Sequence, residues 1–122
     1  MIAVGSKLRS IDNSGARIVE CVKILGGKNK KNGKVGDTII VSVKTINPLK
    51  KIKKGDVLRG IIVSVKKGTR RYNGDMVSFN INSVVIVNNK NIPVGTRVLG
   101  PVMLELRARK FMKILSMSTV AI

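Results

Sequence analysis

The sequence predicts an all-β fold: a small closed β-barrel followed by two short C-terminal helices. Short apolar, β-branched runs recur along the chain, each bounded by a cluster of Gly, Asn or Asp, and no long helical pattern lies among them. A chain of 122 residues is expected to form one domain with one modest core. We expect the barrel and its loops over residues 1–102, and a C-terminal helical segment and tail over residues 103–122.

A tight turn joins the first two expected strands, residues 7–11 and residues 17–25. Residues 12–15 read Asp-Asn-Ser-Gly, in which Asp or Asn can bond its own backbone and Gly accepts a positive φ. The apolar residues of the second strand fall on both faces, which suits a barrel strand covered by loops on its outer side. Cys21 lies in this strand, and we interpret it as a small buried hydrophobe rather than a reactive thiol.

Two strands in the middle of the chain begin after the same pair of residues, Gly-Asp. Residues 38–44 alternate cleanly between apolar and polar side chains, which is typical of a half-buried strand. Residues 57–66 form the longest expected strand, with Val57 on its apolar face. Asp37 and Asp56 precede these strands, and we interpret them as turn residues rather than as a catalytic pair.

A basic loop separates the longest strand from the last two, residues 76–79 and residues 84–87. The loop tip carries four cations between apolar arms, which is the turn chemistry of a hairpin or of a longer β-loop. Arg59 interrupts the apolar face before this loop. We therefore expect Arg59 at the rim of the barrel.

From Gly95 onward the pattern changes to helical spacing. Apolar residues recur at intervals of three and four, at Val102, Leu106, Phe111, Ile114 and Leu115. The basic run over residues 107–110 interrupts this pattern, so we expect two short helices rather than one. Their apolar sides, which include Phe111 and Ile114, are assigned to the core against the barrel.

The charge balance is strongly basic, with 24 Lys and Arg against 6 Asp and Glu and a formal net charge of +18. Self-repulsion of this size disfavours a compact free protein, so we expect a polyanionic partner. The sequence has no apolar run long enough to cross a membrane, and its cations lie on Gly-rich loops, so nucleic acid is favoured over lipid. The N-terminus lacks the pattern of a secretory or transit segment, and we expect the protein to work where it is made.

Few residues could carry catalysis. The sequence has no His, and all but one of its six acids lie near expected turns or within an apolar strand. A lone Cys provides neither an internal disulfide nor a zinc site. The Gly-rich loop over residues 26–34 resembles a nucleotide-binding loop, but no Gly-Lys-Ser/Thr sequence follows at the required spacing. We therefore expect no enzymatic activity, no metal, no cofactor and no small-molecule substrate.

Aromatic residues are too few for single-strand binding by base stacking. The sequence has two Phe and one Tyr, and only Tyr72 lies in a basic loop. We therefore expect recognition of folded, largely double-stranded RNA through phosphate contacts and shape. The candidate RNA-binding residues are Lys28, Lys30, Lys31, Lys34, Lys50, Lys51, Lys53, Lys54, Lys66, Lys67, Arg70 and Arg71.

Several motifs together resemble one family of known proteins. Residues 60–86 place two apolar β-branched runs around the basic tip, and the motifs over residues 12–17, 53–58, 95–97 and 110–114 occur in the order of that family. The whole chain resembles the universal family of large-subunit ribosomal protein fourteen, of the bacterial or organellar type. The resemblance implies a five-stranded barrel with a projecting β-ribbon and short C-terminal helices.

The resemblance also implies a function. Members of the family bind large-subunit ribosomal RNA, form intersubunit bridges with small-subunit ribosomal RNA, lie beside ribosomal proteins three and nineteen, and dock a ribosome-silencing factor. The residues here that match the interface are Thr96, Arg97, Arg107, Lys110 and Lys113. The implied location is a ribosome, either in the bacterial cytoplasm or in an organelle (the mitochondrial matrix or the plastid stroma).

The residues alone are also compatible with two other functional classes of protein. A free-standing β-barrel RNA chaperone or translation factor would wash off the large subunit in moderate salt. A DNA-compacting basic protein would bind duplex DNA as well as ribosomal RNA.

Overall fold

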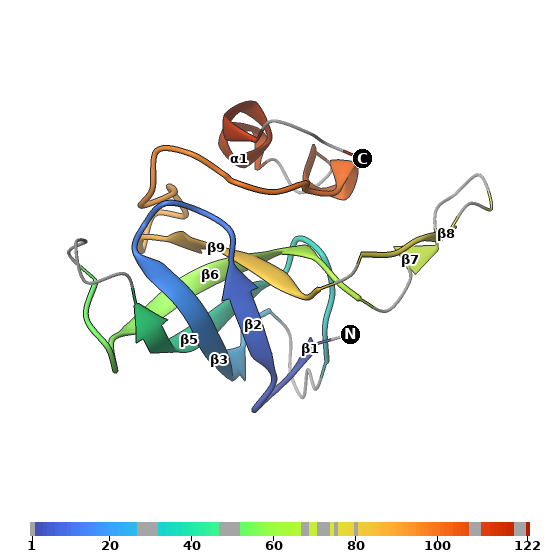
Figure 1. Ribbon diagram of the computed structural model, residues 1–122. Helices are drawn as coiled ribbons and strands as arrows, with labels where there is room; N and C mark the ends of the chain where they lie inside the picture. Colours follow the sequence, from blue (N-terminus) through green and yellow to red (C-terminus); the bar gives the residue numbers. More distant parts are fainter. Residues whose placement is uncertain are drawn as a thin grey trace.

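Five strands close into a barrel in the computed structural model of the protein (Figure 1). They are β2 (Lys7–Ser10), β3 (Ala16–Ile24), β5 (Thr38–Ile46), β6 (Val57–Ser64) and β9 (Ser83–Val87). Neighbouring strands are antiparallel except β2 and β9, which close the barrel in parallel. The expected all-β barrel is confirmed. The structure describes residues 2–26, 32–46, 52–66, 69–70, 74, 76–79, 81–107, 111–118 and 122.

Two short antiparallel pairs lie outside the barrel. β1 (Ile2–Ala3) pairs with β4 (Asn32–Gly33), and β7 (Thr69–Arg70) pairs with β8 (Met76–Val77). The β7–β8 pair projects from the barrel as a ribbon (Figure 1), as the family resemblance implied. β8 is shorter than the strand expected over residues 76–79.

Strands β5 and β6 show where the predicted burial pattern holds and where it is wrong. β5 alternates as expected, with Ile39, Val41 and Val43 fully buried. Val57, expected on the buried face of β6, is 65% exposed. The reason is that β9 begins to pair with β6 only at Arg59. The first residues of β6 therefore have a neighbouring strand on one side only.

The barrel leaves no room for a side chain at Gly60 of β6. A Cβ atom at this position would lie 2.6 Å from Cγ2 of Val84 on β9, and Val84 is itself fully buried. β-branched side chains have few rotamers, so Val84 cannot easily turn away. Glycine at position 60 lets the two strands pack closely.

The C-terminal segment lies over one side of the barrel (Figure 1). It contains a 3-10 helix, η1 (Leu104–Arg107), and an α-helix, α1 (Met112–Met117), so only the second of the two expected helices is an α-helix. Leu106 and Ile114 belong to the buried core, as expected. Phe111, also expected in the core, packs against the core cluster but is only partly buried, and it precedes the first residue of α1.

A buried carboxylate holds the turn between β2 and β3 against the barrel. Asp12 is 5% exposed, and its Oδ1 accepts hydrogen bonds from the hydroxyls of Ser10 and Ser14 at 2.6 and 2.7 Å. Its Oδ2 accepts a hydrogen bond from the backbone N of Ile86 on β9 at 3.0 Å. These bonds offset the cost of burying the carboxylate. Asp12 thus joins a local turn, which the sequence predicted, to a distant strand, which it did not.

Candidate nucleic-acid interface

The candidate RNA-binding lysines that the structure describes are all on the surface. Lys34, Lys53, Lys54 and Lys66 are exposed. Arg70 lies in β7 of the projecting ribbon. The other candidates lie outside the described residues, namely Lys28, Lys30, Lys31, Lys50, Lys51, Lys67 and Arg71.

The same turn presents a lysine before β5 and before β6. Oδ2 of Asp37 accepts a hydrogen bond from the backbone N of Lys34 at 2.7 Å, and Oδ2 of Asp56 accepts one from the backbone N of Lys53 at 3.0 Å. The glycine before each Asp has a φ of 89° or 90°, which an L side chain rarely adopts. The expected turn role of both acids is confirmed.

The two turns lie at opposite ends of the barrel, because β5 and β6 run antiparallel. Lys34 lies at the end where β6 finishes, since the backbone N of Gly36 donates to the carbonyl of Ile62 at 2.8 Å. Lys66 follows β6 at this same end. Lys53 lies at the other end. The structure therefore divides the described candidate RNA-binding lysines into two groups, one at each end of the barrel.

Lys66 lies near two cations that the sequence reasoning did not select, Lys7 and Arg9. Oδ1 of Asn82 accepts a hydrogen bond from the backbone N of Lys66 at 2.7 Å. The carbonyl of Asn82 accepts one from the backbone N of Arg9 at 3.0 Å. Asn82 thereby connects the start of the basic loop to β2.

Lys7, Arg9 and Lys66 line one shallow hollow of about 350 Å³. Ile18 and Ile81, which also line it, are 40% and 39% exposed and give it an apolar floor. β2 alternates between exposed and buried residues, which turns both of its cations outward. The same alternation is visible in the sequence and could have identified these two cations.

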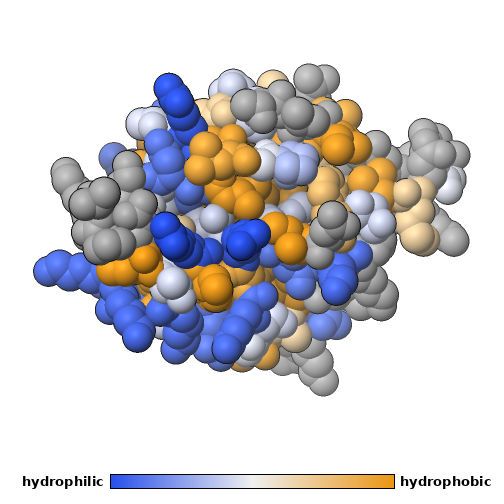
Figure 2. Space-filling view, in the orientation of Figure 1, coloured by the Kyte–Doolittle hydropathy of each residue, from blue (hydrophilic) through white to orange (hydrophobic). Residues whose placement is uncertain are grey.

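Few charges of the described surface are neutralised within the protein. Between residues that the structure describes, one ion pair is present, and it joins Nζ of Lys44 to Oε2 of Glu20 at 3.5 Å with both side chains partly exposed. Figure 2 shows hydrophilic side chains grouped around apolar patches on one face of the molecule. Such a surface keeps its positive charge available to an external polyanion.

The loop that carries Thr96 and Arg97 is held by the side chain of Asn13. Oδ1 of Asn13 accepts hydrogen bonds from the backbone N of Thr96 and of Arg97 at 2.7 and 3.0 Å. Nδ2 of Asn13 donates to Oγ1 of Thr96 at 2.7 Å. A Cβ atom at Gly95 would lie 2.5 Å from Oδ1 of Asn13, so glycine permits this close approach. The sequence reasoning missed Asn13 because its partner lies 83 positions away.

The loop over residues 95–97 lies next to α1 in space, because the residue that follows it, Val98, pairs with the residue after α1. Val98 forms one isolated bridge with Asp12 and another with Ser118, which follows the last residue of α1. The loop therefore lies beside the C-terminal end of α1. Asn13 and its neighbour Asp12 fix both the barrel turn and this loop.

The structure places only some of the candidate residues of the subunit interface near one another. Thr96, Arg97 and Lys113 are exposed, with Lys113 in the first turn of α1 rather than beside the loop. Arg107 is the last residue of η1. Lys110 lies outside the described residues.

The described residues offer little for metal or covalent chemistry. Cys21 is 1% exposed, and burial raises the pKa of its thiol, so the neutral and less reactive form is favoured. The interpretation of Cys21 as a buried hydrophobe is confirmed. Among the described residues, no three of His, Cys, Asp and Glu are placed to hold a metal ion. The described helices include none long and apolar enough to cross a membrane.

A family model matches the whole chain. The model of ribosomal protein L14p/L23e covers residues 1–122. This match agrees with the motif order in the sequence, and it implies a structural role in the large ribosomal subunit. The chain belongs to the ribosomal protein L14p/L23e family.

Proposed function

We propose that the protein binds large-subunit ribosomal RNA directly through its basic loops and contributes to intersubunit bridges with small-subunit ribosomal RNA. The observation that carries this proposal is the presentation of exposed lysines on rigid turns, in which Asp37 and Asp56 hold Lys34 and Lys53 at strand ends. Exposed lysines on turns whose backbone is held by hydrogen bonds suit phosphate contacts, which place a protein on folded RNA without reading individual bases. The formal net charge of +18 provides the long-range attraction.

The proposed RNA-binding surface has two parts, one at each end of the barrel. Lys34, Lys66 and Lys7 belong to one end, and Lys53 and Lys54 belong to the other. A surface of this kind would contact separate RNA segments and hold them at a fixed distance. The further proposed contacts are Arg9, Lys28, Lys30, Lys31, Lys50, Lys51, Lys67, Arg70 and Arg71.

We propose a second surface for the subunit interface and for a silencing factor. Its members are Thr96, Arg97, Arg107, Lys110 and Lys113. The support for it is the family match together with the hydrogen bonds that fix the loop over Thr96 and Arg97. On the same family grounds, ribosomal proteins three and nineteen are proposed neighbours, and the proposed ribosome is bacterial, mitochondrial or plastid.

The RNA-binding proposal is tested by the salt dependence of binding. Purified protein is titrated with large-subunit ribosomal RNA at several salt concentrations, and the double variant Lys53→Ala/Lys54→Ala is compared with Lys44→Ala. Lys44 is the matched control because it is exposed but already paired with Glu20. We expect the double variant to flatten the slope of log K against log salt by about 0.7 to 0.9 for each phosphate that is no longer neutralised by a lysine.

Three outcomes would count against the proposal. An unchanged slope in the double variant would remove this end of the barrel from the RNA interface. Release of the protein from large subunits in moderate salt would favour a free-standing RNA chaperone or translation factor. Equal affinity for duplex DNA would favour a DNA-compacting protein.

A further inference from the structure

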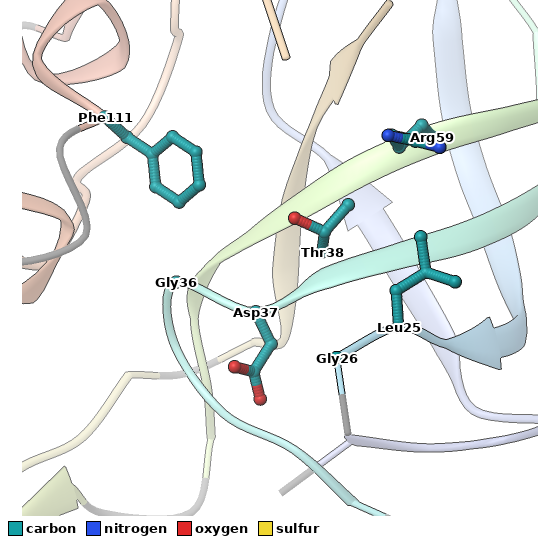
Figure 3. A pocket seen from close by; sticks show the side chains of 7 residues that line it. All are labelled: Leu25, Gly26, Gly36, Asp37, Thr38, Arg59 and Phe111. Carbon is teal, nitrogen blue, oxygen red and sulfur yellow. The ribbon is translucent and has the colours of Figure 1, made fainter. Parts of the chain in front are cut away.

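A pocket of about 540 Å³ lies between the barrel and the C-terminal segment (Figure 3). Leu25 after β3, Thr38 at the start of β5, Arg59 on β6 and Phe111 before α1 contribute to its lining. The volume is within the range of about 300 to 1,000 Å³ that is typical of small-ligand sites. None of the proposed RNA-contacting lysines is among the described lining residues, but Gly36 and Asp37 of the turn that carries Lys34 are, so this site borders the basic surface.

Arg59 brings a guanidinium to the pocket without a partner from the described residues. Its side chain is only half-exposed, yet no hydrogen bond or ion pair joins it to any residue that the structure describes. Asp37 also lines the pocket, but its Oδ2 accepts the hydrogen bond of Lys34 in its own turn, and its carboxylate points away from Phe111 in Figure 3. A guanidinium remains charged and binds phosphate oxygens well. The pocket is therefore suited to an anionic ligand on its Arg59 side.

Phe111 supplies a different chemistry on the side of the pocket opposite Arg59, and Thr38 lies between the two (Figure 3). The ring of Phe111 extends into the pocket, and the hydroxyl of Thr38 points toward it (Figure 3). The carbonyl of Thr38 accepts a hydrogen bond from the backbone N of Leu25 at 3.0 Å, whereas its hydroxyl bonds to none of the described residues. An aromatic face, a hydrogen-bonding hydroxyl and an arginine are the groups with which proteins hold unstacked nucleotides.

We propose that this pocket holds one unstacked nucleotide of ribosomal RNA, with its base on the ring of Phe111 and its phosphate at Arg59. The inference rests on the proposed function and adds a base contact to it. The sequence did not count Phe111 for base stacking because it was assigned to the core. Phe111 does pack against the core, but it also lines this pocket. A nucleotide fits the lining better than an acidic side chain of a protein, because a carboxylate would use Arg59 but not the ring.

The test is the affinity of the protein for large-subunit ribosomal RNA as a function of salt. Phe111→Leu keeps an apolar side chain but removes the ring, and we expect affinity to fall about 5-fold to 150-fold with an unchanged salt slope. Phe111→Tyr keeps the ring and should restore binding. Arg59→Gln should weaken binding and also flatten the slope by about 0.7 to 0.9.

Dimethyl sulfate modification of the RNA gives a second measurement. An unpaired base should be protected by the wild-type protein and by Phe111→Tyr, and become reactive with Phe111→Leu. If thermal melting shows that Phe111→Leu does not fold, the Arg59→Gln titration and the wild-type protection pattern decide whether the pocket holds a nucleotide.

Several results would overturn the inference. One is wild-type affinity for both Phe111→Leu and Arg59→Gln, and another is the absence of any protected unpaired base. Normal RNA binding by Phe111→Leu, combined with failure to enter large subunits, would assign the pocket to a protein partner instead. A wild-type protein that does not bind ribosomal RNA at all would overturn the proposed function itself and this inference with it.

Discussion

The barrel and the C-terminal segment are stabilised in different ways. Every residue of β9 is buried, and Ile61, Ile62 and Val63 of β6 are fully buried within the barrel wall. By contrast, α1 has six residues, buries only Ile114, and has neither a side-chain cap nor charges that favour its ends. A helix of this length is not stable by itself. Packing against the barrel therefore decides whether α1 forms.

This difference means that the barrel is a framework on which the C-terminal segment is docked. The segment is attached by a few fully buried side chains, among them Met103, Leu106 and Ile114, and by the hydrogen bond from the backbone N of Met103 to the carbonyl of Val63 at 3.1 Å. Local opening costs less free energy than global unfolding. We therefore expect the amides of α1 to exchange with solvent faster than those of β9. The following substitutions test this contrast, beginning with the largest expected change in stability.

Ile61→Ala should have the largest effect, because it leaves a cavity in a fully buried part of the barrel. We expect the free energy of unfolding to fall by about 2 to 5 kcal/mol, measured by urea denaturation. Ile92→Ala, at a position that is 41% exposed, is the control and should change it much less. Equal losses at the two positions would show that the barrel interior is not the main source of stability.

Asp12→Ala should be the next most damaging change. It removes the acceptor of the Ile86 backbone N and leaves that buried group without a partner, at a cost of about 1 to 3 kcal/mol. Asp56→Ala removes a turn carboxylate near the surface and should cost less. Urea denaturation of both variants makes the comparison, and a larger loss for Asp56→Ala would contradict the role given to Asp12.

Asn13→Ala should show most clearly that the barrel and the C-terminal segment are stabilised in different ways. It removes the bonds to the loop over Thr96 and Arg97, and we expect a global loss of only about 0.5 to 1.5 kcal/mol. Hydrogen exchange should become faster in α1 while β9 stays protected.

Asn88→Ala is the matched control for this substitution. Oδ1 of Asn88 also accepts two backbone hydrogen bonds, from Lys90 and Ile92 at 2.8 and 3.0 Å, but in a different loop. The Asn88→Ala substitution should leave the rate of amide hydrogen exchange in α1 unchanged. Faster exchange of α1 in both variants would mean that Asn13 has no special part in docking the segment.

Lys113→Glu should have the smallest effect on stability, within about 0.5 kcal/mol, because the side chain is exposed. Large subunits should contain the variant in normal amounts but join small subunits poorly, since a carboxylate would replace a cation of the proposed subunit interface. Sedimentation of the subunits measures this, with large-subunit content as the control. Normal joining would remove Lys113 from the proposed interface.

Local patterns in the sequence determined most of the barrel. Alternation placed β5 correctly, and the Gly-Asp pairs before β5 and β6 identified turns in which Asp37 and Asp56 accept backbone hydrogen bonds. These features depend on residues a few positions apart, so their physical cause is visible in any short window. The basic surface was likewise visible, because charge is a property of composition.

Only the tertiary structure decided which distant residues meet. The bond from Ile86 to Asp12 and the bonds from Asn13 to Thr96 join positions 74 and 83 residues apart, and no local periodicity marks such partners. The same holds for Arg59 and Phe111, which a strand and a C-terminal segment bring to one pocket. Helical spacing assigned Phe111 to the core, and it does pack against the core, but only the tertiary structure showed that it also lines this pocket.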